Sequence, residues 1–216
     1  IAGGGIAVYK NTSVGSTISF ELMSGLLQAH AEFESGGIDF PLFVNAADIP
    51  SFLDVDEDGD MDILTFAVSG AELEYYENQS QELFGDNEHL IYELKNTCWG
   101  YFREGALDNA ITLFDTCQNN VINPKSFENN AGIHVGSTVL SLDLNGDLIK
   151  DLLIGDVTSR NLIALINGGT LQSAGMTGQF PDFPTNTVGV DIQTFPAAFY
   201  VVVDADNIND LLVTPN

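Results

Sequence analysis

A run of nine residues, Asp54 to Asp62, carries aspartate at every second position and glycine at its sixth. Alternate side chains of a tightly curled loop point inward, so this spacing brings several carboxylate oxygens toward one point. Ca²⁺, which takes about six to eight oxygen ligands in flexible geometry, suits such a set of donors. Gly59 permits the sharp turn with which the backbone curls around an ion. The run therefore predicts a calcium-binding loop.

Two further acidic runs resemble the first. Asp143 to Asp151 places Asp or Asn at positions 1, 3, 5 and 9 and has Leu148 where the first run has Gly59. Asp204 to Asp210, counted from its first aspartate, is two residues shorter and lacks the Asp-Gly step. We expect calcium at the first two runs. For the third we leave open whether Asp204, Asp206 and Asp210 bind calcium or form a metal-free turn.

The acidic runs belong to a longer repeat. Each lies between short apolar runs of the kind that forms strands, and Asn78 and Asn167 each follow the first aspartate of their run by 24 residues. The unit is a strand, an acidic loop, a strand, a turn and a strand ending in Asn, which predicts an all-β fold. Ile6–Asn11 has the form of the last strand, so we expect the chain to be a piece of a larger domain that begins and stops within repeats.

Charge limits the possible partners. The chain has 31 Asp and Glu against 6 Lys and Arg, a net charge of −25. Such a balance argues against nucleic acid, whose phosphates need a basic surface, and against an anionic membrane. Twelve of the 31 acids lie in the three acidic runs, so part of this charge is expected to face bound cations. No run of about 18 apolar residues predicts a membrane span.

The interval between the first two acidic runs is the longer one, and we expect it to hold a surface insertion around residues 95–120. Cys98 and Cys117 lie there. They are expected to form a disulfide if the protein is extracellular, and two free buried thiols are the alternative. Trp99, Tyr101 and Phe102 could form an exposed recognition patch, or they could pack the core of the insertion.

The residues Asp54-x-Asp56-x-Asp58-Gly59-x-x-Asp62 followed by Ile63-Leu64, and Asp143-x-Asn145-x-Asp147-x-x-x-Asp151 followed by Leu152-Leu-Ile-Gly155, resemble FG-GAP/VCBS repeats. These repeats are the calcium-loop blades of integrin-α-like β-propellers. The resemblance implies an all-β propeller of four-stranded antiparallel blades, seven-bladed when complete, of which this chain covers about three. The expected divisions are the end of a blade at 1–25, a blade at 26–79, a blade with the insertion at 80–170, and the start of a further blade at 171–216.

The resemblance also implies the ligands. In the first loop these are the side chains of Asp54, Asp56, Asp58 and Asp62 and the backbone carbonyl of Asp60. In the second they are the side chains of Asp143, Asn145, Asp147 and Asp151 and the carbonyl of Ile149. An EF-hand is disfavoured, because it needs Glu at position 12 between helices, where the two runs have Thr65 and Ile154.

We expect a non-catalytic, secreted or cell-surface module, stabilised by Ca²⁺, that binds a protein or a glycan in bacterial adhesion. The remaining blades of the same propeller are further expected partners. The insertion and the blades are also similar to repeat proteins exported by the type IX secretion pathway. The alternatives are a propeller accessory to a secreted hydrolase or lyase, and a structural spacer in a large surface protein. The fold alone does not identify a ligand.

Overall fold

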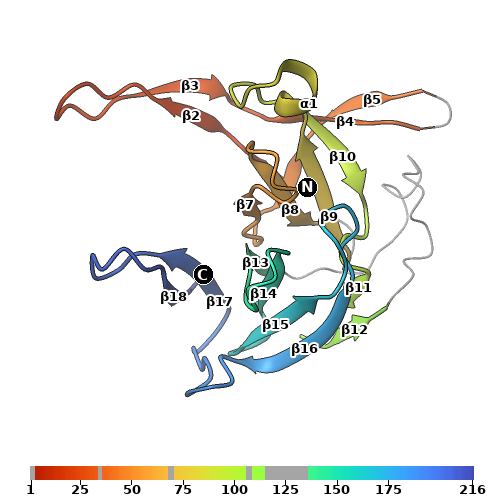
Figure 1. Ribbon diagram of the computed structural model, residues 1–216, viewed down its shortest axis with the longest axis vertical. Coiled ribbons are helices and arrows are strands. Elements are labelled where there is room, and N and C mark those ends of the chain that lie inside the picture. The colour runs from red at the N-terminus through yellow and green to blue at the C-terminus, as the bar shows by residue number, and fades with distance from the viewer. Residues whose placement is uncertain (1–2, 34–35, 68–70, 106–108, 115–135) are drawn as a thin grey trace.

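The structure, a computed structural model, describes residues 3–33, 36–67, 71–105, 109–114 and 136–216 (Figure 1). Within these ranges strands dominate, and the one helix, α1 (Ser80–Phe84), has five residues. The expected all-β fold is therefore confirmed. No helix in the described ranges combines the length and apolar character that crossing a bilayer requires.

The first sheet contains the first acidic run and its flanking strands. Its four consecutive antiparallel strands are β7 (Ser51–Leu53), β8 (Asp62–Phe66), β9 (Leu73–Asn78) and β10 (Tyr92–Asn96). At its far edge β10 pairs in parallel with β4 (Gln28–Ala31), which pairs antiparallel with β5 (Ile38–Pro41), so the sheet has six strands.

The second sheet repeats the same order. Its four consecutive antiparallel strands are β13 (Ser137–Leu142), β14 (Asp151–Asp156), β15 (Leu162–Asn167) and β16 (Met176–Phe183). The first three strands of each sheet are those of the predicted repeat. The boundaries expected at 79/80 and 170/171 fall inside the sheets, because β10 and β16 pair with the strands that precede them.

Four two-stranded pairs complete the described chain. They are β1 (Gly3–Gly5) with β6 (Phe43–Asn45), β2 (Val8–Asn11) with β3 (Phe20–Ser24), β11 (Phe102–Glu104) with β12 (Ile111–Leu113), and β17 (Pro196–Val201) with β18 (Asp210–Pro215). The β17–β18 hairpin contains the third acidic run. Along the chain, the first sheet, the second sheet and this hairpin follow one another on an arc (Figure 1).

The first strands of these three units lie side by side. Ile49, just before β7, donates its N–H to Ser137 O at 3.1 Å and accepts from Val139 N–H at 2.9 Å. The hydroxyl of Thr138 on β13 donates to Pro196 O on β17 at 2.8 Å. A Cβ on Gly155 would lie 1.9 Å from Pro196 O, so the second sheet and the hairpin approach as closely as backbone permits. These contacts fix the order of the units around their first strands.

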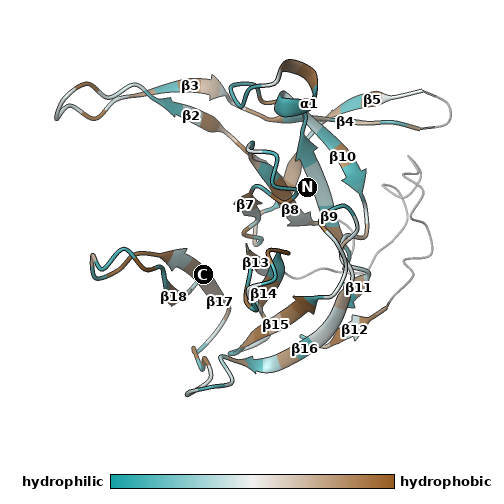
Figure 2. Ribbon diagram, in the orientation of Figure 1, coloured by the Kyte–Doolittle hydropathy of each residue, from teal (hydrophilic) through white to brown (hydrophobic). Residues whose placement is uncertain are grey.

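Alternating side chains of β8 and β9 fill two cores, as expected for a sheet buried on both faces. One face packs between the two sheets, where Leu64 and Phe66 share a buried cluster with Leu152 and Ile154. The other face, with Ile63, packs against the strands of residues 27–44. Each large side chain fully buried here contributes about 1.5–3 kcal/mol. Figure 2 shows the apolar character of β15, which lies in the shared core.

The start of the insertion packs into that shared core. Trp99 and Phe102 are buried there, and the rings of Phe102 and Phe66 meet edge to face with centroids 6.4 Å apart. Of the two readings of this aromatic segment, packing is therefore the one that holds for Trp99 and Phe102. Cys98 is buried and disulfide-bonded, whereas Cys117 lies outside the described residues.

Candidate metal centre

All three acidic runs form the same hairpin connection between the first and second strands of their units. The pairing closes each connection at equivalent residues: Leu53 with Asp62, Leu142 with Asp151, and Val201 with Asp210. We define the first loop as residues 54–62, the second as 143–151 and the third as 202–210. Each has nine residues and ends on an aspartate.

The third loop therefore begins at Val202, and the count from Asp204 that made it two residues short is wrong. Its backbone supports this alignment, because positive φ angles recur at positions 4 and 6 of every loop. The residues are Glu57 and Gly59, Gly146 and Leu148, and Ala205 and Asn207. The first aspartate is missing, with Val202 in its place, whereas Asp204, Asp206 and Asp210 occupy positions 3, 5 and 9. The sequence hides this register because the first acid of the run, Asp204, stands at position 3 of the loop.

The aspartate at position 9 ties the loop to its sheet. Asp62 is fully buried, and its Oδ2 accepts from Val55 N–H at 2.8 Å while its Oδ1 accepts from Asn78 N–H at 2.8 Å. Asp151 accepts from Leu144 and Asn167 N–H in the same way, at 2.9 and 2.7 Å. The repeated 24-residue interval follows from this geometry, because the Asn that ends the third strand donates to the last aspartate of the loop.

Burial raises the pKa of Asp62 to about 7, although the hydrogen bonds from Asn78 and Val55 act in the opposite direction. Burial raises the pKa of Asp151 for the same reason. The predicted role of position 9 was that of a metal ligand. Its two oxygens are occupied by backbone donors in both loops, so its first role is to join three strands, and coordination would use the remaining lone pairs.

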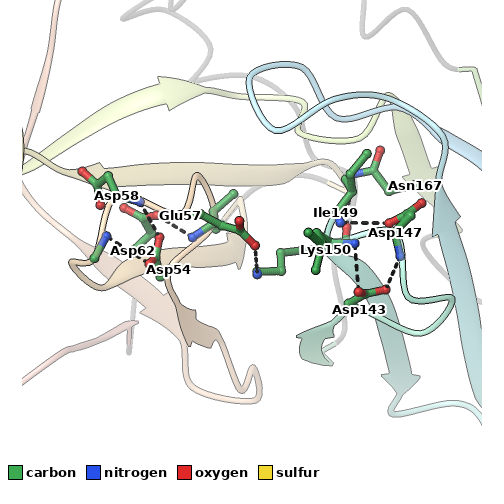
Figure 3. A network of polar contacts seen from close by, with 12 residues as sticks. Asp54, Glu57, Asp58, Asp62, Asp143, Asp147, Ile149, Lys150 and Asn167 are labelled. Atoms are coloured by element: carbon green, nitrogen blue, oxygen red, sulfur yellow. Dashed lines mark hydrogen bonds and ion pairs between the residues drawn. The ribbon is translucent and has the colours of Figure 1, made fainter.

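The first loop gathers carboxylates. Asp54, Asp56 and Asp58 each place an oxygen so that all three lie within 4.8 Å of one another. The Asp54 carboxylate also accepts from Asp58 N–H at 3.1 Å and from Gly59 N–H at 3.0 Å, which sets the curl of the loop (Figure 3). Within the described residues, Asp56 Oδ1 and Asp58 Oδ2 are buried without a hydrogen-bond partner.

Those buried oxygens meet the requirement of a hard cation for convergent, unprotonated oxygen ligands. Burial, and next the neighbouring Asp58, raises the pKa of Asp56 to about 6. Two carboxylates this close disfavour each other's ionised forms, and a divalent cation removes that penalty. The first loop can thus hold a metal ion, and its donors are carboxylate oxygens of the kind that a hard divalent cation prefers.

Three carboxylates escaped prediction as ligands. Glu77 at the end of β9 and Glu82 on α1 join the side chain of Asp60 around the first loop, in the groups Asp56–Glu77–Glu82 and Asp58–Asp60–Glu82. Asp60 was expected to offer only its carbonyl. The sequence does contain one sign that these glutamates lie near the loop. Glu77 precedes Asn78 by one residue and Glu82 follows it by four, and Asn78 is the residue that repeats at a fixed distance from the loop.

The second loop is more open. Although burial acts to raise it, the pKa of Asp143 is held below its usual range by N–H donors, chiefly those of Leu148 and Gly146. Asn145 Nδ2 donates to Asp147 Oδ2 at 2.9 Å, and Asn145 Oδ1 accepts from Asp147 N–H at 2.9 Å. Among the described residues, groups of three acidic ligands occur only at the first loop. Calcium in the second loop would need the amide oxygen of Asn145.

The third loop has the same turn without the first ligand. Asp206 N–H donates to Asp204 Oδ1 at 3.2 Å, and Ile208 N–H donates to Asp206 Oδ1 at 2.8 Å. The equivalent bond in the second loop joins Ile149 N–H to Asp147 Oδ1, also at 2.8 Å. The turn itself therefore does not depend on the aspartate at position 1, whereas the number of carboxylate ligands does.

The first and second loops contact each other directly. Lys150 Nζ lies 3.1 Å from Glu57 Oε1 (Figure 3). The pair is partly exposed, so it contributes at most about 1 kcal/mol. Its position nevertheless shows that the two loops lie at the same end of neighbouring sheets.

Comparison of the chain with protein-family models, curated proteins and solved structures gave no match.

Proposed function

We propose that the chain is part of a non-catalytic β-propeller of the FG-GAP/VCBS kind, stabilised by Ca²⁺, that binds a protein or a glycan outside the cell or at its surface. One observation carries the proposal. Three loops of nine residues, with the same left-handed positions and the same closing aspartate, join the first two strands of three consecutive units.

The arrangement of the units supports a propeller. In that architecture four-stranded antiparallel sheets surround an axis, with their first strands innermost. Here two sheets with that strand order, followed by a hairpin, pack through their first strands, as the bonds of Ile49 with Ser137 and of Thr138 with Pro196 illustrate. The loops that carry the aspartates then lie at one end of successive blades, which agrees with the Glu57–Lys150 contact.

The proposed role of calcium is structural. The first loop joins β7 to β8, and an ion held by Asp54, Asp56 and Asp58 would fix that connection. An ion that binds only the folded chain stabilises it by RT ln(1 + [Ca²⁺]/Kd), or about 2.7 kcal/mol at a hundredfold excess over Kd. Catalysis would instead need an open coordination position beside a nucleophile, and the proposal assigns none.

A surface cavity offers a place for the partner. It lies between the insertion and the outer strands of the second sheet, and amide side chains from Asn109, Asn161 and Gln179 line it. At its rim Arg160 Nε is 2.6 Å from Asp191 Oδ1. Asn109 Nδ2 donates to Ser159 Oγ at 2.7 Å and to Asn161 Oδ1 at 3.0 Å, so these two amides shape the wall of the cavity. The proposal assigns contact with glycan hydroxyls or peptide groups to the amide of Gln179 and to the charged pair. We therefore propose that the protein or glycan partner binds in this cavity, against residues 109–111 of the insertion.

Thermal melting in Ca²⁺ and in EDTA tests the proposal. Calcium at a hundredfold excess should raise the midpoint by about 5–10 °C, since about 1 kcal/mol corresponds to about 2–4 °C for a domain of this size. The double substitution Asp56→Ala, Asp58→Ala should remove most of the shift. Asp204→Ala, Asp206→Ala, at the same positions of the third loop, is the matched control and should keep it. An unchanged midpoint in wild-type protein would refute the calcium role.

A further inference from the structure

The first repeat carries acids that the second lacks. Three acidic positions of the first repeat are apolar in the second at the same distance along the chain: Asp60 corresponds to Ile149, Glu77 to Ile166 and Glu82 to Leu171. All three lie outside the side-chain ligands that the loop pattern itself predicts. A single loop ion does not account for them, because the second loop keeps the turn without them.

Asp60 is built into the protein rather than left in solvent. The residue is only 4% exposed, and its Oδ2 accepts from Gln81 N–H of α1 at 3.1 Å. Its Oδ1 is buried and has no hydrogen-bond partner in the described part of the chain. An orphaned buried carboxylate oxygen costs several kcal/mol unless something pairs with it.

Two other carboxylates converge with Asp60. Asp58 and Glu82 place oxygens so that all three ligand atoms lie within 4.8 Å of one another. Asp58 Oδ2 is likewise buried without a hydrogen-bond partner among the described residues. One residue of this group comes from α1 and two come from the loop, so the group bridges two segments that only the fold brings together.

No basic side chain neutralises this group in the described ranges. The nearby Glu77 is neutralised by Lys95, whose Nζ lies 3.0 Å from its Oε2. The ion pairs of the described residues include none to Asp58, Asp60 or Glu82. Three carboxylates at this separation repel one another strongly in a partly buried site, and a divalent cation is the counter-charge that suits them.

We propose that the first loop holds two divalent cations: the loop ion at Asp54, Asp56 and Asp58, and a second ion at Asp58, Asp60 and Glu82, with Asp58 bridging them. The second ion would fasten α1 to the loop, a connection that the second repeat does not need because no helix follows Asn167. The chemistry is that of Ca²⁺, with carboxylate oxygens as ligands. The inference rests on the proposed calcium role of the first loop.

Counting bound calcium tests the second site. Wild-type chain and variants are dialysed to equilibrium against Ca²⁺ and the ion-to-protein ratio is measured by mass spectrometry of the elements. Glu82→Gln should lower the ratio by one ion per chain. Glu88→Gln, an exposed glutamate just beyond α1, removes the same charge and should leave the ratio unchanged. Asp60→Asn, with folding checked by circular dichroism, should also lose one ion.

The outcomes separate this inference from the proposed function. Equal ratios in the Glu82→Gln and Glu88→Gln variants, with calcium still bound, would mean that one ion serves the whole cluster. That result would overturn the second site and leave the calcium loop standing. If wild-type chain binds no calcium, both proposals fail. Loss of one ion from Glu82→Gln alone among the two glutamate variants, with a calcium-dependent rise of the melting midpoint that Asp56→Ala, Asp58→Ala still removes, supports two ions. Loss of that rise together with the ion would mean that Glu82 binds the single loop ion, and it would overturn the second site.

Discussion

Replacing Asp62 by alanine tests whether the aspartate at position 9 stabilises the fold by holding the first loop to its sheet. The substitution removes the acceptor for two buried backbone donors, the N–H groups of Val55 and Asn78, both at 2.8 Å. Each buried donor left unsatisfied costs about 1–3 kcal/mol, so we expect a loss of about 2–6 kcal/mol. The hydroxyl of Tyr75, at 3.3 Å from the same carboxylate, adds little because the bond is long.

The assay is urea unfolding in EDTA at pH 4.5, which removes any contribution from metal. At that pH Asp62, with a pKa of about 7 in the folded chain, is protonated when folded, and the unfolded chain, with an ordinary pKa of about 3.9, is only partly ionised. The proton uptake that the substitution relieves is therefore limited to about 1 kcal/mol and offsets only part of the loss. Asp210→Ala is the matched control. Its position in the loop is the same, but it is exposed, and among the described residues its carboxylate accepts from Val203 N–H alone. The expected loss is therefore below about 1 kcal/mol. Equal losses in the two variants would refute this reasoning.

Three further predictions test the loops and their packing. In EDTA the melting midpoint should fall as pH rises from about 5 to 8, because the raised pKa values of Asp56, about 6, and Asp62, about 7, make ionisation costlier in the folded than in the unfolded chain. Saturating Ca²⁺ should flatten this fall, and a pH-independent midpoint in EDTA would contradict it. Gly155→Ala should lower the free energy of unfolding by about 1–3 kcal/mol or more, because the new Cβ would clash with Pro196 O. Gly175→Ala is the control, since its Cβ would enter open space and should change the free energy little. Denaturant unfolding of the two variants compares these losses. Leu148→Gly should raise the free energy of unfolding by up to about 1 kcal/mol, because glycine adopts the φ of 70° at this exposed position without strain. A lower free energy of unfolding in this variant would show that Leu148 is not strained.

The sequence predicts the local elements well because their signals are local. Acidic spacing indicates the loops, and short apolar runs indicate the strands that flank them. The interval to Asn78 and Asn167 is recognisable as a repeat before its cause is known. The cause is a hydrogen bond to the last aspartate of the loop, formed across two strands.

What depends on pairing between distant segments could not be predicted. The parallel pairing of β10 with β4 joins residues more than sixty positions apart and leaves no periodic pattern. The register of the third loop is also hidden in the sequence, because Val202 replaces the aspartate that begins the other two loops. Glu82 is a candidate ligand because α1 contacts the loop through the bond from Gln81 N–H to Asp60, and a helix of five residues is too short to give a helical period in the sequence.

The most direct test of the calcium account is a crystal structure of the chain grown in Ca²⁺, with anomalous differences collected at long wavelength. The account predicts a strong anomalous peak enclosed by Asp54, Asp56 and Asp58, with oxygen ligands at about 2.3–2.6 Å. A first loop that is ordered in millimolar Ca²⁺ but has no such peak would contradict it.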